Sequence, residues 1–309
     1  MEAVGELNVK TQKNMMDTAQ ENKELILIFN ELLRYGFSKL QGFPLHLDKY
    51  RLKKKLLHRM MAATQSYSEA ILKLMGTTPV YDKAAEVLYR SLVENLINLG
   101  FIYSSKTQEN ALIFSADSIQ DSNDFAKRYK ALMLKYPTWK LDFGHIDTPE
   151  KWDKFIADNN KKLARYQKRN KVTLPNKLFG LKKRAIVQDD FLKAKNKFNQ
   201  GKSFESYYVT YYKFFSQVAH LTLPGLERFF VVRPDGSMHL IIDGDQESVG
   251  RILAITYQIY FVFLRFTLQE LKLFNIEEYK KFDNFSKNMI RGPKQSREKV
   301  TSTSSSSKL

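Results

Sequence analysis

The chain has 309 residues, of which 43% are hydrophobic and 13% aromatic, so it can bury a substantial core and differs in composition from disordered chains. It contains no cysteine, which excludes disulfides, thiolate zinc sites and thiol nucleophiles and indicates a reducing, cytoplasmic location. Its net charge of +17 is concentrated: residues 151–202 hold 16 basic and 4 acidic residues, a net +12, and residues 281–309 hold 7 and 2, a net +5. These two segments should dominate the attraction of polyanions.

The N-terminal half of the chain has the pattern of long helices. Residues 1–15 are polar, and we expect them to be a flexible segment that precedes a helical domain over residues 16–290. Hydrophobic spacing predicts three long helices, from about Met16 to Tyr35 with an end near Gly36, from about Leu47 to Met75, and from about Tyr81 to Ser104. The wide apolar face of the third indicates that it lies at the centre of the domain.

The C-terminal half combines further helices with one hairpin signal. Shorter helices are expected over 105–150, followed by the basic insert 151–202 and a helix from about Phe204 to Leu221. Two β-rich runs flank Pro-Asp-Gly-Ser and predict a small β-hairpin near 229–242. Two helices, about Glu247 to Phe274 and Ile276 to Phe285, precede a basic, serine-rich tail at 291–309 that we expect to be disordered. The predicted fold class is therefore all-α, a multi-helix bundle with one small hairpin.

We expect no transmembrane segment. The longest uncharged apolar run, Ile252 to Leu264, would rise only ~20 Å as a helix, short of the ~30 Å hydrocarbon core, and predicts a buried helix instead. The first residues lack the apolar core of a signal peptide. The final Ser-Lys-Leu matches a peroxisomal address, which we interpret as coincidence in a serine-rich tail.

The basic insert is the strongest functional signal. Its cations recur at helical spacing with interleaved aromatics, an arrangement that can present several charges to phosphates and stack bases of single strands. An acidic protein, a lipid headgroup or merely a solvated surface are the alternatives, and no recognised nucleic-acid-binding module accompanies the charge. The candidate nucleic-acid contacts, to RNA or DNA, are Lys161, Lys162, Arg165, Lys168, Arg169, Lys171, Lys182, Lys183 and Arg184.

Two polar stripes form a second candidate site. Arg90, Glu94 and Asn98 share one helix face through their i, i+4 spacing, as do Tyr212, Ser216 and His220 on another helix. If these helices pack together, a titratable imidazole, a hydroxyl and an ion pair would meet, a set that could support acid–base or nucleophilic chemistry. A hydrogen-bonded cluster that only fixes helix packing is the alternative, and contact with a ligand is a third.

The same residues carry a resemblance. Arg90-x3-Glu94 in LYRSLVENLINLGFIY, followed by Tyr212-x3-Ser216-x3-His220, resembles a helical, mainly bacterial family of unknown function over about residues 50–110 and 204–245. The resemblance implies an all-α bundle and a link to mobile or phage-defence loci, but no activity. The basic insert lies outside it, and we expect that insert to be this protein's own addition.

Other chemistry lacks support in the sequence. The five histidines are scattered and no nucleotide-binding or esterase motif is present, so we predict no metal site and no cofactor. Three hypotheses remain. The first is a non-enzymatic cytosolic protein that binds nucleic acid through residues 151–202 and the tail. The second is a metal-independent ribonuclease using His220 as acid and base, with Glu94 and Arg90 supporting the transition-state charge. The third is an interaction module for an acidic protein partner.

Overall fold

The computed structural model describes residues 2–41, 43, 52–77, 81–105, 107–136, 148–171, 180–195, 203–220, 230–232, 237–240 and 246–291. The chain divides into two compact units, Met1–Leu273 and Phe274–Leu309. The predicted tail at 291–309 lies outside the described residues except for Arg291.

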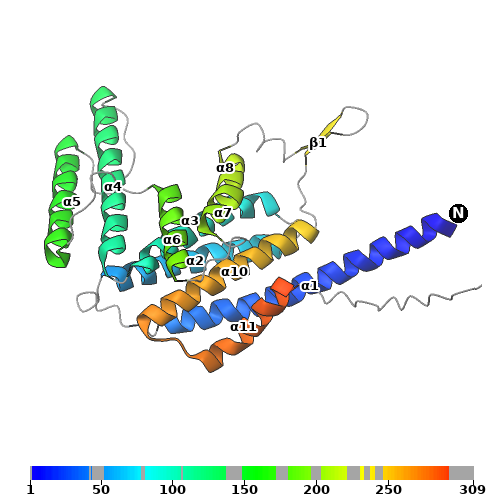
Figure 1. The fold of residues 1–309 in the computed structure, drawn as a ribbon. Coiled ribbons are helices and arrows are strands. Elements are labelled where there is room, and N and C mark those ends of the chain that lie inside the picture. Colours follow the sequence, from blue (N-terminus) through cyan, green and yellow to red (C-terminus); the bar gives the residue numbers. More distant parts are fainter. Residues whose placement is uncertain are drawn as a thin grey trace, which may run out of the picture. The chain divides into compact units, whose positions relative to one another are not determined.

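In the residues described, the first unit contains helices and one pair of very short strands (Figure 1). Its helices are α1 (Glu2–Gln41), α2 (Leu52–Met75), α3 (Asp82–Ser104), α4 (Glu109–Lys135), α5 (Pro149–Asn170), α6 (Leu181–Ala194), α7 (Phe204–Ser206), the π-helix η2 (Tyr207–Tyr212), α8 (Lys213–Ala219) and α10 (Gln246–Leu271). Strands β1 (Phe230–Val232) and β2 (Met238–Leu240) pair antiparallel, with Val231 opposite His239. The second unit contains α11 (Ile276–Arg291). Phe274, which precedes this helix, packs edge to face on Tyr279 within it. The structure is thus helical, as the predicted all-α class requires.

Helix α1 extends beyond both predicted ends. It begins at Glu2, so the sequence assigned to a flexible segment at 1–15 is helical from its second residue. It also continues past Gly36 to Gln41, where the predicted end near Gly36 was wrong. The extension has a tertiary cause: Leu40 is buried, and its carbonyl oxygen lies 3.4 Å from Nε2 of His58 on α2. Gly36 permits close packing, because a Cβ atom there would lie 3.2 Å from Cζ of Tyr260 on α10.

Helix α3 is the centre of the first unit, as its apolar face predicted. It packs against α2, α4, α6, α8, η2 and α10, and Leu92, Val93 and Ile97 are fully buried. Because α3 touches so many helices, its polar side chains can meet residues from distant parts of the sequence. This is the feature that brings the candidate site residues together.

Helix α10 is the most apolar helix described. It packs against α1, α2 and α3, with Tyr257, Tyr260 and Leu264 fully buried. Within it, Ser248–Leu271 is long and apolar enough to cross a membrane by length and composition. This segment contains the uncharged run Ile252–Leu264 and the two arginines that flank it, Arg251 and Arg265. In its most apolar window, 61% is buried inside the protein, and the core helix of a soluble protein passes the same test.

Helices α4 and α5 pack side by side, and α5 carries the first part of the basic insert 151–202 (Figure 1). Trp152 of α5 is buried against Ala126 and Tyr129 of α4. Asn123 of α4 donates to Oδ1 of Asn160 at 2.9 Å and accepts from Nδ2 of Asn159 at 3.0 Å. The apolar and amide contacts together orient α5, so they decide which of its faces is left for solvent.

Candidate functional site

Arg90 joins the two polar stripes. Its Nε donates to Oγ of Ser216 at 2.9 Å, and its Nη2 donates to the hydroxyl oxygen of Tyr212 at 2.7 Å. The guanidinium also lies over the Tyr212 ring, 4.6 Å from its centroid. Since the Arg90 side chain is 23% exposed, these contacts hold a cation in one orientation at the edge of the helix interface. The predicted meeting of the two helices therefore occurs, through an arginine held by a phenol and a hydroxyl.

A π-helical turn shapes this part of the interface. Tyr207–Tyr212 form η2, in which the backbone N–H of Lys213 donates to the carbonyl of Tyr208. The wider turn stacks the Tyr208 and Tyr212 rings, with centroids 5.4 Å apart and 16° between the planes. Single π turns inside α-helices are frequent at functional sites, because they re-aim side chains relative to a regular helix.

A buried aromatic layer lies beneath Arg90. The Tyr89 ring is 4.8 Å from Phe215 and 6.0 Å from Tyr211 between centroids, both edge to face. Burial raises the pKa of Tyr89 well above its ordinary value, with smaller contributions from Tyr211 and Tyr207. Tyr89 therefore stays neutral and anchors α3 to the segment that carries Tyr212 and Ser216.

Glu94 and His220, the other two residues of the proposed catalytic set, make fewer contacts with this cluster. Glu94 lies at the edge of the cluster, with Oε2 3.9 Å from Nη1 of Arg90 and a side chain that is 41% exposed. His220 is exposed just beyond the end of α8, and its backbone N–H donates to the carbonyl of Ser216. Within the described parts of the chain, no contact joins its imidazole to Arg90 or Glu94. The structure thus gathers Arg90, Tyr212 and Ser216, with Glu94 beside them, but does not bring in His220.

Arg184 lies in the interior, in contrast to the other cations proposed for nucleic acid. Its side chain is 7% exposed, forms an ion pair with Asp117 on α4, and donates from Nη1 to Oδ1 of Asn98 on α3 at 2.7 Å. Its guanidinium is 5.1 Å from the Phe114 ring centroid. Burial lowers the pKa of Arg184, and the carboxylate of Glu94 opposes this shift. Arg184 therefore joins α6 to α3 and α4 and is not a surface contact.

Helix α6 also positions the segment that carries Tyr212. Its buried Asp189 accepts from the backbone N–H groups of Phe204 at 2.7 Å and Glu205 at 2.9 Å, at the start of α7. On the other side, Gly100 of α3 leaves room for Phe204, because a Cβ atom there would lie 2.6 Å from Cε1 of that ring. Sequence reasoning missed both residues, and no local pattern identifies them.

The basic face of α5 is exposed as predicted for a binding surface. At about 100° per residue, Lys161, Arg165, Lys168, Arg169 and Lys162 fall within an arc of about 120°, on the side away from Trp152. All five are exposed, and Lys171 follows at the end of the helix. Among the described residues, the carboxylate nearest to these six cations is that of Asp158, 3.9 Å from Nζ of Lys161 with both side chains well exposed. The charge of this face is therefore hardly neutralised.

The remaining candidate lysines belong to a different helix. Lys182 and Lys183 are exposed at the start of α6, which packs on α3, whereas α5 packs on α4. The residues between them, 172–179, lie outside those that the structure describes. Where the structure describes the predicted insert, it forms two helices with separate partners, of which α5 carries the denser charge.

Residues outside the basic insert extend the positive region. A cavity of about 250 Å³ between α2, α4 and α5 is lined by Lys55 and Arg59 of α2 together with Lys162 of α5. Both residues of α2 belong to a basic stretch near the start of that helix. Their i, i+4 spacing was the signal that could have placed both on one face.

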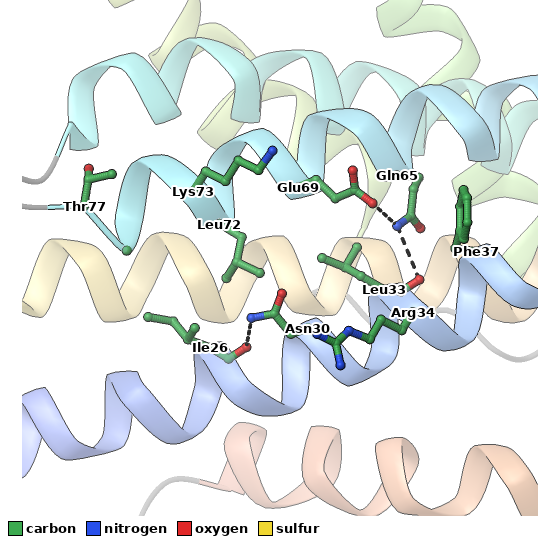
Figure 2. A pocket seen from close by; sticks show the side chains of 11 residues that line it. Ile26, Asn30, Leu33, Arg34, Phe37, Gln65, Glu69, Leu72, Lys73 and Thr77 are labelled. Carbon is green, nitrogen blue, oxygen red and sulfur yellow. Dashed lines mark hydrogen bonds between the residues drawn. The ribbon is translucent and has the colours of Figure 1, made fainter.

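A larger cavity, of about 800 Å³, lies between α1 and α2 (Figure 2). Gln65 lies on its wall and donates from Nε2 to the carbonyl of Leu33 at 3.3 Å and to Oε1 of Glu69 at 2.5 Å. Its Oε1 also accepts from the hydroxyl of Tyr260. Asn30 donates to its own helix at Ile26. These polar groups serve helix packing, and no cluster of three potential metal ligands occurs among the described residues here or elsewhere.

These contacts define an all-α protein with an arginine held between two helices and a basic helix on its surface. The chain matches the family of unknown function DUF5677 over residues 54–238 and belongs to that family. The matched range runs through 151–202, which the motif resemblance had left outside. No curated protein and no solved structure matches the chain.

Proposed function

We propose that this protein binds nucleic acid in the cytoplasm through the outward face of α5. The observation that carries the proposal is the stripe of exposed cations, Lys161, Lys162, Arg165, Lys168 and Arg169, with hardly any carboxylate beside it. Phosphates replace condensed counterions at such a stripe, and the release of those ions favours binding at low salt. Tyr166, between Lys162 and Arg169 in sequence, adds a ring on which a base of a single strand can stack.

The stripe is presented by a helix that is fixed in the fold. Helix α5 is held to α4 by Trp152 and by the amides of Asn123, Asn159 and Asn160. Its first turn is also capped, with the Thr148 hydroxyl accepting from the N–H of Lys151 at 3.4 Å. The cations are therefore presented from one stable face.

A salt series tests the proposal. Fluorescence anisotropy with labelled single- and double-stranded RNA and DNA measures the association constant. Its logarithm should fall linearly with the logarithm of the salt concentration, with a slope of about 0.7 to 0.9 per neutralised phosphate. The triple variant Arg165→Ala, Lys168→Ala, Arg169→Ala should lower this slope by about 2 to 3. The control removes equal charge from exposed positions elsewhere, with Lys23→Ala, Lys73→Ala and Arg251→Ala, and should keep the wild-type slope. Undetectable binding at low ionic strength, or equal slopes in both variants, contradicts the proposal.

A metal-independent ribonuclease is the second candidate. It is favoured by the orientation of Arg90, whose guanidinium is fixed by Tyr212 and Ser216 yet remains partly exposed, as a group that stabilises charge on a phosphate must be. His220 would supply acid and base catalysis from the end of the same helix. Labelled RNA incubated with wild type and with His220→Ala is the test. Equal products from both proteins, or none from either, contradict it.

An acidic protein partner would use the same charged face. The expected result would be a pull-down that survives nuclease treatment, together with no binding to RNA or DNA in the salt series.

A role in bacterial phage defence is compatible with the nucleic-acid proposal. It is tested by the plating efficiency of phages on cells that carry the wild-type protein and on cells that carry the triple α5 variant.

A further inference from the structure

The cavity between α2, α4 and α5 combines positive charge with aromatic and hydroxyl groups. It has a volume of about 250 Å³. Its lining residues are Leu52, Lys55, Leu56 and Arg59 of α2, Phe114, Ser115, Ser118 and Ile119 of α4, and Lys162 and Tyr166 of α5. Three of these residues are cations, and no acidic residue is among them.

The three cations are available for a ligand. Among the described residues, no carboxylate lies within ion-pair distance of Lys55, Arg59 or Lys162. Lys53 shows the contrast within the same helix turn: it is buried, 3.2 Å from Oε2 of Glu270, and donates to the carbonyl of Ser105 at 3.1 Å. Because side chains two residues apart point about 200° apart on a helix, Lys53 is buried in the core and Lys55 lines the cavity.

The size and charge of the cavity select the anion. A phosphate monoester carries about −1.5 to −2 charges at neutral pH, and a phosphodiester carries one, so a cavity lined by three cations and no acidic residue favours the monoester. The volume is below the usual range of about 300–1,000 Å³ for drug-sized ligands, which suits a terminal phosphate with its sugar. Lys162 lies 6.0 Å from the centroid of the Tyr166 ring, so cation and stacking surface are adjacent.

We propose that this cavity binds the terminal phosphate monoester of a nucleic-acid strand that lies along α5. The inference rests on the proposed nucleic-acid binding and adds to it a preference for phosphorylated strand ends. Lys162 connects the two surfaces, since it belongs both to the exposed stripe of α5 and to the cavity lining. Lys55 and Arg59 supply charge from α2, whereas the hydroxyl of Ser118 on α4 donates to the carbonyl of Phe114 in its own helix at 3.1 Å.

The test compares one single-stranded oligonucleotide in three forms: with a 5′-phosphate, with a 3′-phosphate, and with hydroxyls at both ends. Wild type should bind one phosphorylated form at least about tenfold more tightly than the unphosphorylated form, the value expected for one added charge-assisted contact. The double variant Lys55→Ala, Arg59→Ala should lose this preference and still bind the unphosphorylated strand. Lys162→Ala, from a different helix, should lose the preference too, which guards against misfolding of the first variant. The control pair Lys23→Ala, Lys73→Ala should keep it.

The outcomes separate the two proposals. If no oligonucleotide binds at low salt, nucleic-acid binding itself fails. If all three forms bind wild type equally, the strand surface stands and the cavity proposal is overturned. A preference that persists in both cavity variants overturns it as well. If adenosine monophosphate alone binds as tightly as the phosphorylated strand, the ligand is a free nucleotide and the strand-end proposal is overturned.

Discussion

Replacing Arg184 by methionine should destabilise the fold and leave nucleic-acid binding by the folded protein intact. Methionine keeps most of the apolar stem beside Phe114 but removes the charge. The change leaves the carboxylate of Asp117, 26% exposed, without its cation, and the buried side-chain oxygen of Asn98 without its donor. Each charge-assisted hydrogen bond contributes about 1.5–3 kcal/mol, and removing one partner of a buried ion pair costs about 3–5 kcal/mol, so we expect a loss of about 3–5 kcal/mol.

Urea denaturation followed by far-ultraviolet circular dichroism measures this loss, and Lys183→Ala is the matched control. Lys183 is the preceding residue, is exposed, and should change the free energy of unfolding by less than about 0.5 kcal/mol. Adding Asp117→Asn to Arg184→Met should recover part of the loss, because no unpaired carboxylate then remains. The reasoning is refuted if Arg184→Met unfolds like wild type while its affinity for nucleic acid falls as a surface contact would require.

Three further predictions concern the supports of the candidate site. Arg90→Lys keeps the charge but replaces the planar fork, which donates from Nε to Ser216 and from Nη2 to Tyr212, with a single ammonium nitrogen on a shorter side chain. Thermal unfolding should therefore show a loss of about 1–2 kcal/mol, against about 1 kcal/mol for Tyr212→Phe, and equal stability of all three proteins would contradict this. Gly100→Ala places a Cβ against Phe204 and should cost about 1–3 kcal/mol in the same assay, whereas Gly180→Ala, with open space around it, should cost less than half as much. Burial raises the pKa of Asp189 above its ordinary value of 3.8, so ionisation of its carboxyl costs more free energy in the folded than in the unfolded state. The stability advantage of wild type over Asp189→Asn should therefore shrink as the pH rises from below 3.8 towards neutrality. An advantage that grows over this pH range would contradict the prediction.

Helix periodicity accounts for what could be predicted about the Arg90 cluster. Arg90 and Glu94 share a face by their spacing, as do Tyr212 and Ser216, and both stripes border apolar faces that must be buried somewhere. Contact between the stripes remained conditional on the packing of the two helices, and the tertiary structure supplies that packing, since α3 contacts η2 and α8. The direction of His220 could not be predicted in this way, because the helix ends beside it at Ala219.

Burial of individual charges could not be predicted, since it depends on partners far away in the chain. Arg184 and Lys183 look alike in sequence, yet Arg184 meets Asn98 and Asp117, 86 and 67 positions earlier, while Lys183 faces solvent. The same holds for the cavity, where Lys55 and Arg59 meet Lys162 only because α2, α4 and α5 converge.

Local information in the chain was therefore sufficient for the helices, the all-α class and the stripe of cations on α5, since each depends on residues within a few positions of one another. Which cations remain outside, which one becomes a buried ion pair, and where α1 ends were decided by packing between helices. Burying a charge is costly without a partner, and only the folded arrangement supplies one.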